Sequence, residues 1–194
     1  MTKDIKVKKR NGRLESINLD KINKCAQRAS SGIDNVSSSE IVLDASIQLY
    51  DKIPTEEIDK ALIMSARSKI EKEPNYTYVG ARMLLNNLYK EVFGETVDSD
   101  TFELQYKKSF IQNIKRLVKV GRLSDKLLDY DLRLLSEQIN VQRDSLFKYL
   151  GIQTLYDRYF IHIDQRRMEA PQSFWMRVAM GLCLNEKNKG HFCF

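Results

Sequence analysis

The sequence has no long apolar run, and this absence argues against a membrane-spanning helix. Among its 194 residues, no stretch approaches the roughly 18 uninterrupted apolar residues that a bilayer-crossing helix needs. The N-terminus is charged and polar, without the apolar core of a signal peptide, so we expect a cytoplasmic protein. With 42% hydrophobic and 30% charged residues, the chain has the composition of an ordinary soluble protein, long enough for one large or two small domains.

Cysteine and histidine are scarce, which argues against two further classes of protein. The three cysteines, Cys25, Cys183 and Cys193, are an odd number without CxxC spacing, so neither a disulfide framework nor a zinc ribbon is expected. The two histidines, His162 and His191, are too far apart to suggest a local ligand pair. His191 and Cys193 by themselves do not supply the four ligands of a structural zinc site. We therefore expect no metal site.

A basic hairpin that leads into a helix opens the chain. Residues 6–10 and 13–17 are two short strands joined by Asn11-Gly12, a dipeptide that suits the positive φ angles of a type I′ turn. Asn18 then stands at the N-cap position, before a helix whose free N–H groups attract anions. The cations that converge on this helix start are Lys8, Lys9, Arg10, Arg13 and Lys21. This arrangement predicts a polyphosphate site; the alternative is a solvated edge hairpin whose charges discourage edge pairing.

Helical spacing of apolar residues continues through the first hundred residues. Ser37 has the capping-box position for a second helix, and residues 51–54 could add a third strand to the hairpin. Thr55 is expected to cap a third helix, and residues 76–93 to form a fourth that ends at Gly94. These segments predict four helices under a small three-stranded sheet.

The second hundred residues predict a mainly helical region after a polar connector at 95–101. A basic helix is expected at 106–120, a second helix at 127–141, a mixed aromatic segment at 149–160, and a strongly apolar last helix whose start is set by Pro171. The basic helix could bind nucleic acid, but such a face is more often solvated, with lysine stems covering apolar surface. The net charge of +6 does not argue for nucleic acid, because acidic residues are interspersed almost throughout.

Three stretches resemble one known family. Residues 7–22 look like the opening of an ATP-cone, the regulatory nucleotide-binding module at the N-terminus of many ribonucleotide reductase large subunits, and residues 76–90 resemble its fourth helix. Residues 149–181 resemble the helical domain that precedes the catalytic barrel of class I large subunits, in the form found in T-even-type bacteriophages. The implied fold is α+β and mainly helical: an ATP-cone at 1–95, a helical domain at 96–182, and a tail at 183–194 outside the family.

The resemblance also implies an allosteric site for ATP or dATP, with Mg²⁺. Cations of the hairpin and of the fourth helix would contact the triphosphate, and apolar side chains would face the adenine. Asp59 departs from the family pattern, because many bacterial relatives have histidine there, and an acid repels phosphate unless it is turned away or screened. The implied contacts are Val7, Lys9, Arg10, Glu15, Ile17, Asn18, Lys21, Ile22, Thr55, Ile58 and Lys90.

The catalytic parts of the family are missing from the matched region. Its radical cysteine, redox cysteine pairs and active-site Asn and Glu lie downstream, so we assign no catalytic residue and no redox cofactor, and expect the chain alone to be inactive. The resemblance implies the regulatory piece of a split ribonucleoside-diphosphate reductase, like that of an Aeromonas T-even-type phage. A second polypeptide would supply the barrel, covering the last helix at 174–184, and a small radical-bearing subunit would complete the enzyme. The alternatives are a standalone ATP-cone regulator that binds DNA through the basic helix, and a truncation whose cone merely folds.

Overall fold

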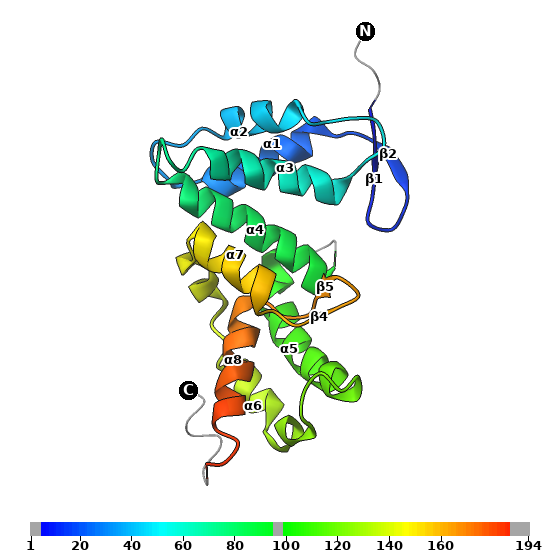
Figure 1. The fold of residues 1–194 in the computed structure, drawn as a ribbon, viewed down its shortest axis with the longest axis vertical. Helices are drawn as coiled ribbons and strands as arrows, with labels where there is room; N and C mark the ends of the chain where they lie inside the picture. The colour runs from blue at the N-terminus through cyan, green and yellow to red at the C-terminus, as the bar shows by residue number, and fades with distance from the viewer. Residues whose placement is uncertain (1–4, 95–98, 187–194) are drawn as a thin grey trace. The chain divides into compact units, whose positions relative to one another are not determined.

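The structure is a computed structural model that describes residues 5–94 and 99–186. It divides into two compact units, of which the first comprises Met1–Asn87 with Phe147–Gln153 and the second Leu88–Leu146 with Thr154–Phe194. Helices α4 (Tyr76–Phe93) and α7 (Tyr149–Arg158) contribute residues to both units (Figure 1). The architecture is mainly helical, as the sequence predicts, with two small sheets, of which only the three-stranded one was predicted.

A three-stranded sheet stands at the start of the first unit. Its strands are β1 (Lys6–Lys8), β2 (Leu14–Ser16) and β3 (Ile53–Pro54), in the order β2-β1-β3. Strand β1 is antiparallel to β2, with Lys6 opposite Ser16, and parallel to β3, with Val7 opposite Ile53. The predicted hairpin and the predicted third strand are therefore both confirmed.

The hairpin turn is not the predicted type I′ turn. The Gly12 N–H donates to the Lys9 carbonyl, and the Lys9 N–H donates to the Arg13 carbonyl, each at 2.8 Å. Gly12 has a φ of 84°, whereas Asn11 keeps a negative φ. This is a three-residue loop, in which a type I turn is followed by one left-handed residue. Asn11 has a different role from the predicted one, because its side-chain oxygen accepts the Arg13 N–H at 3.1 Å.

Two of the three predicted caps of the first unit are confirmed. The helices are α1 (Leu19–Ser30), α2 (Ser38–Ser46) and α3 (Thr55–Ser68), followed by α4. The Asn18 side chain accepts the Lys21 N–H at 3.0 Å, and Ser37 accepts the Glu40 N–H at 3.3 Å. The cap predicted at Thr55 is wrong: Pro54 is the N-cap of α3, and no side chain bonds this end. The reason is that Pro54 still belongs to β3, so the helix begins directly where the strand ends.

Helix α2 contacts both α1 and α3 in the core of the first unit (Figure 1). Helix α3 buries one face whose residues follow helical spacing, among them Ile58, Ala61, Leu62, Ser65 and Ala66. Helix α2 turns Ile41 and Ala45 inward, four residues apart. Leu43 and Ile47, which also follow helical spacing in the sequence, are 66% and 80% exposed. The small Ala45 side chain suits close packing of α2 against its neighbours, which explains why that face is inward.

The second unit is built on α5 (Phe102–Lys119), which begins a turn earlier than predicted. Its buried residues are Tyr106, Phe110, Ile114 and Leu117. The helix predicted over 127–141 is wrong. In its place the chain forms two 3-10 turns, Asp125–Asp129 and Val141–Leu146, around the short α6 (Leu132–Glu137). Asp131 explains this break, because its carboxylate caps α6 by accepting the N–H groups of Arg133 and Leu134, both at 3.0 Å.

The last elements of the second unit are a small hairpin and α8 (Pro171–Leu182), which begins at proline as predicted. The hairpin joins β4 (His162–Ile163) to β5 (Arg166–Arg167) and has no counterpart in the sequence analysis. Its two turn residues, Asp164 and Gln165, have φ of 47° and 67°, the pattern of a type I′ turn.

Some predictions fall partly or wholly on residues outside the described ranges. Positions 95–98 of the predicted connector and positions 187–194 of the predicted tail, with His191 and Cys193, are among them. Within the described residues, no helix is both long enough and apolar enough to cross a membrane.

Candidate functional site

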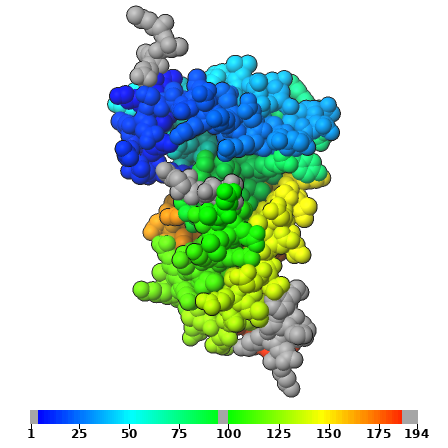
Figure 2. Space-filling model, turned by 180° about the vertical axis from the view of Figure 1, so that it is seen from behind, coloured from blue at the N-terminus to red at the C-terminus, as the bar shows by residue number. Residues whose placement is uncertain are grey.

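Strand pairing brings three of the predicted site segments to one edge of the first unit. Lys8 pairs with Pro54 in the parallel register, so Lys9 and Thr55 follow next to each other at the ends of β1 and β3. Strand β2 runs through Ile17 directly into the N-cap Asn18 of α1. The hairpin, the start of α1 and the start of α3 therefore adjoin. In Figure 2 the hairpin and α1, both in blue, form a continuous part of the surface of this unit.

The start of α1 has the properties of an anion-attracting helix end. Asn18 satisfies the Lys21 N–H, while the N–H groups before it have no acceptor inside the helix. The Lys21 side chain is exposed in the same turn. The helix dipole and this ammonium group act in the same direction on a nearby anion.

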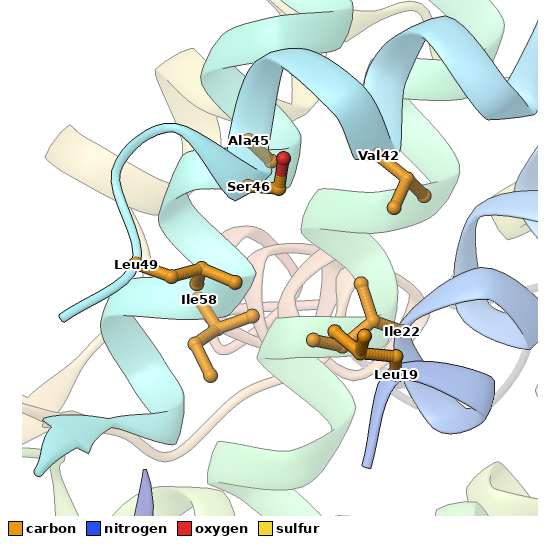
Figure 3. A pocket seen from close by; sticks show the side chains of 7 residues that line it. All are labelled: Leu19, Ile22, Val42, Ala45, Ser46, Leu49 and Ile58. Atoms are coloured by element: carbon orange, nitrogen blue, oxygen red, sulfur yellow. The ribbon is translucent and has the colours of Figure 1, made fainter. Parts of the chain in front are cut away.

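An apolar hollow lies between α1, α2 and α3 (Figure 3). Two of its lining residues, Ile22 and Ile58, belong to the predicted site. In Figure 3 the side chains of Leu49 and Ile58 lie on one side of the hollow and those of Leu19 and Ile22 on the other. The cavity measures about 10 Å³, the room of a single water, so a purine ring enters only if lining side chains move. The hollow is also lined by residues of α2 and of the segment that follows it, which were not predicted as site residues: Val42, Ala45, Ser46 and Leu49.

Two of the cations predicted to bind phosphate, Lys9 and Arg10, face carboxylates. The Lys9 Nζ lies 3.6 Å from the Glu15 Oε2. The Arg10 guanidinium donates through Nη2 to the Asn87 Oδ1 at 2.7 Å. Its Nε lies 3.6 Å from the Glu56 Oε1, and its Nη2 lies 3.7 Å from the Asp59 Oδ2. Neither Asn87 nor Glu56 was predicted to contact Arg10, because no local pattern links residues so far apart; Arg10 and Asn87 are separated by 77 positions in the chain.

The remaining predicted residues divide between the two units. Val7 is buried in β1, and the Ile17 N–H donates to the Ile5 carbonyl at 2.9 Å, so both hold the sheet together. Lys90 lies near the end of α4 and belongs to the second unit. Its role, like the nucleotide contacts of the other residues, stays a prediction.

The described residues offer no ready metal centre. Across residues 5–94 and 99–186, no group of three or more His, Cys, Asp or Glu side chains could hold a metal ion. A divalent cation at this site would therefore depend on the phosphates of a ligand for most of its oxygen ligands.

Models of two protein families match the chain. The family described as "ATP cone domain" matches residues 5–91, which include the whole sheet and the helices α1 to α3. The family described as "Ribonucleotide reductase, all-alpha domain" matches residues 145–192. The second match extends past residue 182, the predicted end of the helical domain.

Three curated relatives illustrate the similarity, and each is named as an alpha subunit of a ribonucleoside-diphosphate reductase. The chain is 41% identical over 157 residues to the ribonucleoside-diphosphate reductase subunit alpha of Chlamydia pneumoniae, covering 80% of this chain and 15% of the relative. It is 39% identical over 186 residues to that of Helicobacter pylori, covering 94% and 22%. It is 31% identical over 192 residues to the reductase 1 subunit alpha of Salmonella typhimurium, covering 95% and 24%. The chain thus spans less than a quarter of the length of these relatives.

Proposed function

The chain comprises the N-terminal ATP cone and all-alpha domain of a ribonucleotide reductase alpha subunit, and we propose that its cone is an allosteric site for ATP or dATP. The observation that carries this proposal is the register of the three-stranded sheet. It sets Lys9 beside the start of α3 and leads β2 directly into the N-terminus of α1. Fixed cations and a helix end at one edge are what a polyphosphate requires.

Each part of the nucleotide has a proposed partner among the predicted residues. Lys9, Arg10 and Lys21 contact the triphosphate, and Asn18 keeps the α1 end pointed at it. Glu15 and Thr55 lie beside these groups, and the apolar rim of the hollow, Ile22 with Ile58, takes one face of the adenine. Mg²⁺ would neutralise part of the phosphate charge, and Lys90 is proposed as a further phosphate contact.

A nucleotide at this site acts on the enzyme by favouring one assembly over another. An effector shifts an equilibrium only to the extent that it binds one state more tightly than the other. We propose that the catalytic barrel is supplied by a second polypeptide, as in a split phage-type large subunit, and that a small radical-bearing subunit completes the enzyme. The chain by itself is then inactive.

The proposed contact with the barrel-bearing partner lies on α8. Trp175 and Leu182 of this helix are 50% and 79% exposed, and Tyr159 of the same unit is exposed as well. Large exposed apolar side chains are typical of surfaces that a partner covers.

The alternative function, a regulator that binds DNA, is favoured by one feature of α5. Lys108, Lys115 and Lys119 are exposed on this helix, whereas Lys107 is paired with Glu103 and Glu137, both at 2.9 Å. Binding of duplex DNA that weakens steeply with added salt would support this alternative.

Calorimetric titration of the 194-residue chain with ATP and Mg²⁺ tests the proposed nucleotide site. We expect saturable binding that Lys9→Ala and Lys21→Ala each weaken about tenfold or more, because each removes a charge-assisted contact worth roughly 1.5–3 kcal/mol. Arg28→Ala is the matched control, since this exposed cation lies in the last turn of α1, at the opposite end of the helix. No binding at millimolar ATP, or equal losses in all three variants, would contradict the proposal.

A further inference from the structure

The side chain of Arg10 leaves the hairpin and reaches residues of two helices in the first unit. It donates to Asn87 of α4 at 2.7 Å and faces Glu56 and Asp59 of α3 at 3.6 and 3.7 Å. Glu56 and Asp59 are three residues apart and so share a face of α3. We propose that these carboxylates hold Arg10 as a latch, and that a nucleotide binds by taking the guanidinium from them. This inference rests on the nucleotide site proposed above.

Arg10 makes one direct hydrogen bond and two longer ion pairs. Asn87 is a buried neutral amide, and its oxygen lies at a full hydrogen-bonding distance from Arg10. The two carboxylates lie beyond the roughly 2.7–2.9 Å of a direct charge-assisted bond, so they attract the guanidinium by charge alone. Asn87 therefore fixes the position of the guanidinium, while the carboxylates offset its charge.

The geometry leaves Arg10 able to exchange its anionic partners without leaving Asn87. A guanidinium has five N–H donors in a planar fork, and Asn87 accepts from only one of its nitrogens. Phosphate oxygens that approach the other donors would form direct bonds where the carboxylates form none. The exchange thus replaces two distant anions with one close one, and the buried amide bond is retained.

Asp59 is the stronger of the two competing anions. Its side chain is 14% exposed and that of Arg10 is 16% exposed, so the attraction between them is screened less than that of a surface pair. The side chain of Glu56 is 54% exposed and is screened more. Asp59 therefore opposes the binding of phosphate but not of the nucleoside, and it sets how strongly affinity depends on the phosphate chain.

A double-mutant cycle separates this latch from simple repulsion between Asp59 and phosphate. The full chain, Asp59→Asn, Arg10→Ala and the double variant are each titrated with ATP and with adenosine at fixed ionic strength. We expect Asp59→Asn to lower the Kd for ATP about fivefold and to leave the Kd for adenosine unchanged. In the Arg10→Ala background, the same substitution is expected to change the Kd for ATP by less than about twofold.

Two further variants keep the test specific. Glu57→Gln removes the same charge from the same turn of α3, but its carboxylate accepts from Tyr50 at 2.8 Å, so ATP affinity should not change. Glu56→Gln should strengthen ATP binding in the same direction as Asp59→Asn but less. It also tests the latch if Asp59→Asn fails to fold.

Each other outcome overturns a defined part of the inference. A gain from Asp59→Asn that persists without Arg10 would mean plain repulsion, with no latch. Weaker ATP binding by Asp59→Asn with Mg²⁺ but not with EDTA would make Asp59 a metal ligand. Binding that Lys9→Ala abolishes but Asp59→Asn leaves unchanged would refute the latch alone. An absence of ATP binding in the wild-type chain would refute the nucleotide site, and the latch with it.

Discussion

Asp144 of the second unit offers the sharpest test of how its helices are held together. Its carboxylate is 2% exposed and accepts three hydrogen bonds. Tyr89 of α4 donates at 2.7 Å, Tyr106 of α5 at 2.9 Å, and the Gln172 amide of α8 at 2.8 Å. One side chain from a 3-10 turn therefore joins three helices, and we expect Asp144→Ala to destabilise this unit severely.

The magnitude follows from the donors that alanine would leave without an acceptor. Tyr106 is fully buried, and a buried donor without a partner costs about 1–3 kcal/mol. The hydrogen bonds lost at Tyr89 and Gln172 add to this cost. Removal of the buried carboxylate offsets part of it, because its desolvation cost is no longer incurred. We expect a net loss of about 3 kcal/mol, against a total stability of roughly 5–15 kcal/mol for a typical domain. Asp144→Asn keeps an acceptor and should cost about 1 kcal/mol.

Urea unfolding followed by tryptophan fluorescence measures this loss directly. Trp175 is the single tryptophan of the sequence and lies on α8, so its signal reports the second unit. Gln142→Ala is the control, because Gln142 is exposed on the same 3-10 turn as Asp144 and should change stability by less than about 0.5 kcal/mol. A loss below about 1 kcal/mol for Asp144→Ala would refute the reasoning.

The remaining predictions concern pH and assembly. Burial raises the pKa of Asp144 above its ordinary value of 3.8, although hydrogen bonds from Gln172, Tyr89 and Tyr106 oppose this. Above pH 4 the folded state therefore keeps a proton on Asp144 that the unfolded state has lost. The free energy of unfolding of the wild type, relative to that of Asp144→Asn, should fall as pH rises from about 4 through the folded pKa. Urea titrations of both proteins at several pH values measure this difference. An increase in this relative stability over that pH range would contradict the prediction. Ribonucleotide reduction should require this chain, a barrel-bearing polypeptide and the small subunit together, and activity of the chain alone would exclude the split arrangement.

Much of the first unit was predictable because its signals are local. The side chain of Asn18 caps its own helix, Gly94 ends α4 with a φ of 101°, and α3 buries the apolar positions that its spacing predicts. The turn type at Asn11-Gly12 was wrong because the same dipeptide also suits a three-residue loop, in which only glycine needs a positive φ. The hairpin at Asp164-Gln165 carries no glycine, so the sequence held little signal for it.

The helices of the second unit were harder to delimit because long-range contacts decide where they end. Residues 127–141 have helical spacing, but Tyr130 is buried and donates to the Met180 carbonyl at 2.8 Å. Asp131 caps a new helix directly afterwards. The Tyr130 bond and this cap together fix a bend in the chain that the spacing of apolar residues cannot show. The same limit applies to the candidate site. Its hairpin and helix start follow from sequence, whereas the pairing of Arg10 with Asn87 and Asp59 depends on the tertiary fold.

A titration of the isotope-labelled chain with ATP and Mg²⁺, followed by backbone amide NMR, tests most directly whether the edge formed by the hairpin, α1 and α3 is the nucleotide site. The account predicts the largest shifts at Gly12, Asn18, Lys21 and Thr55, saturating together with a single Kd. Shifts concentrated in α5 or α8, or no shifts at millimolar ATP, would contradict it.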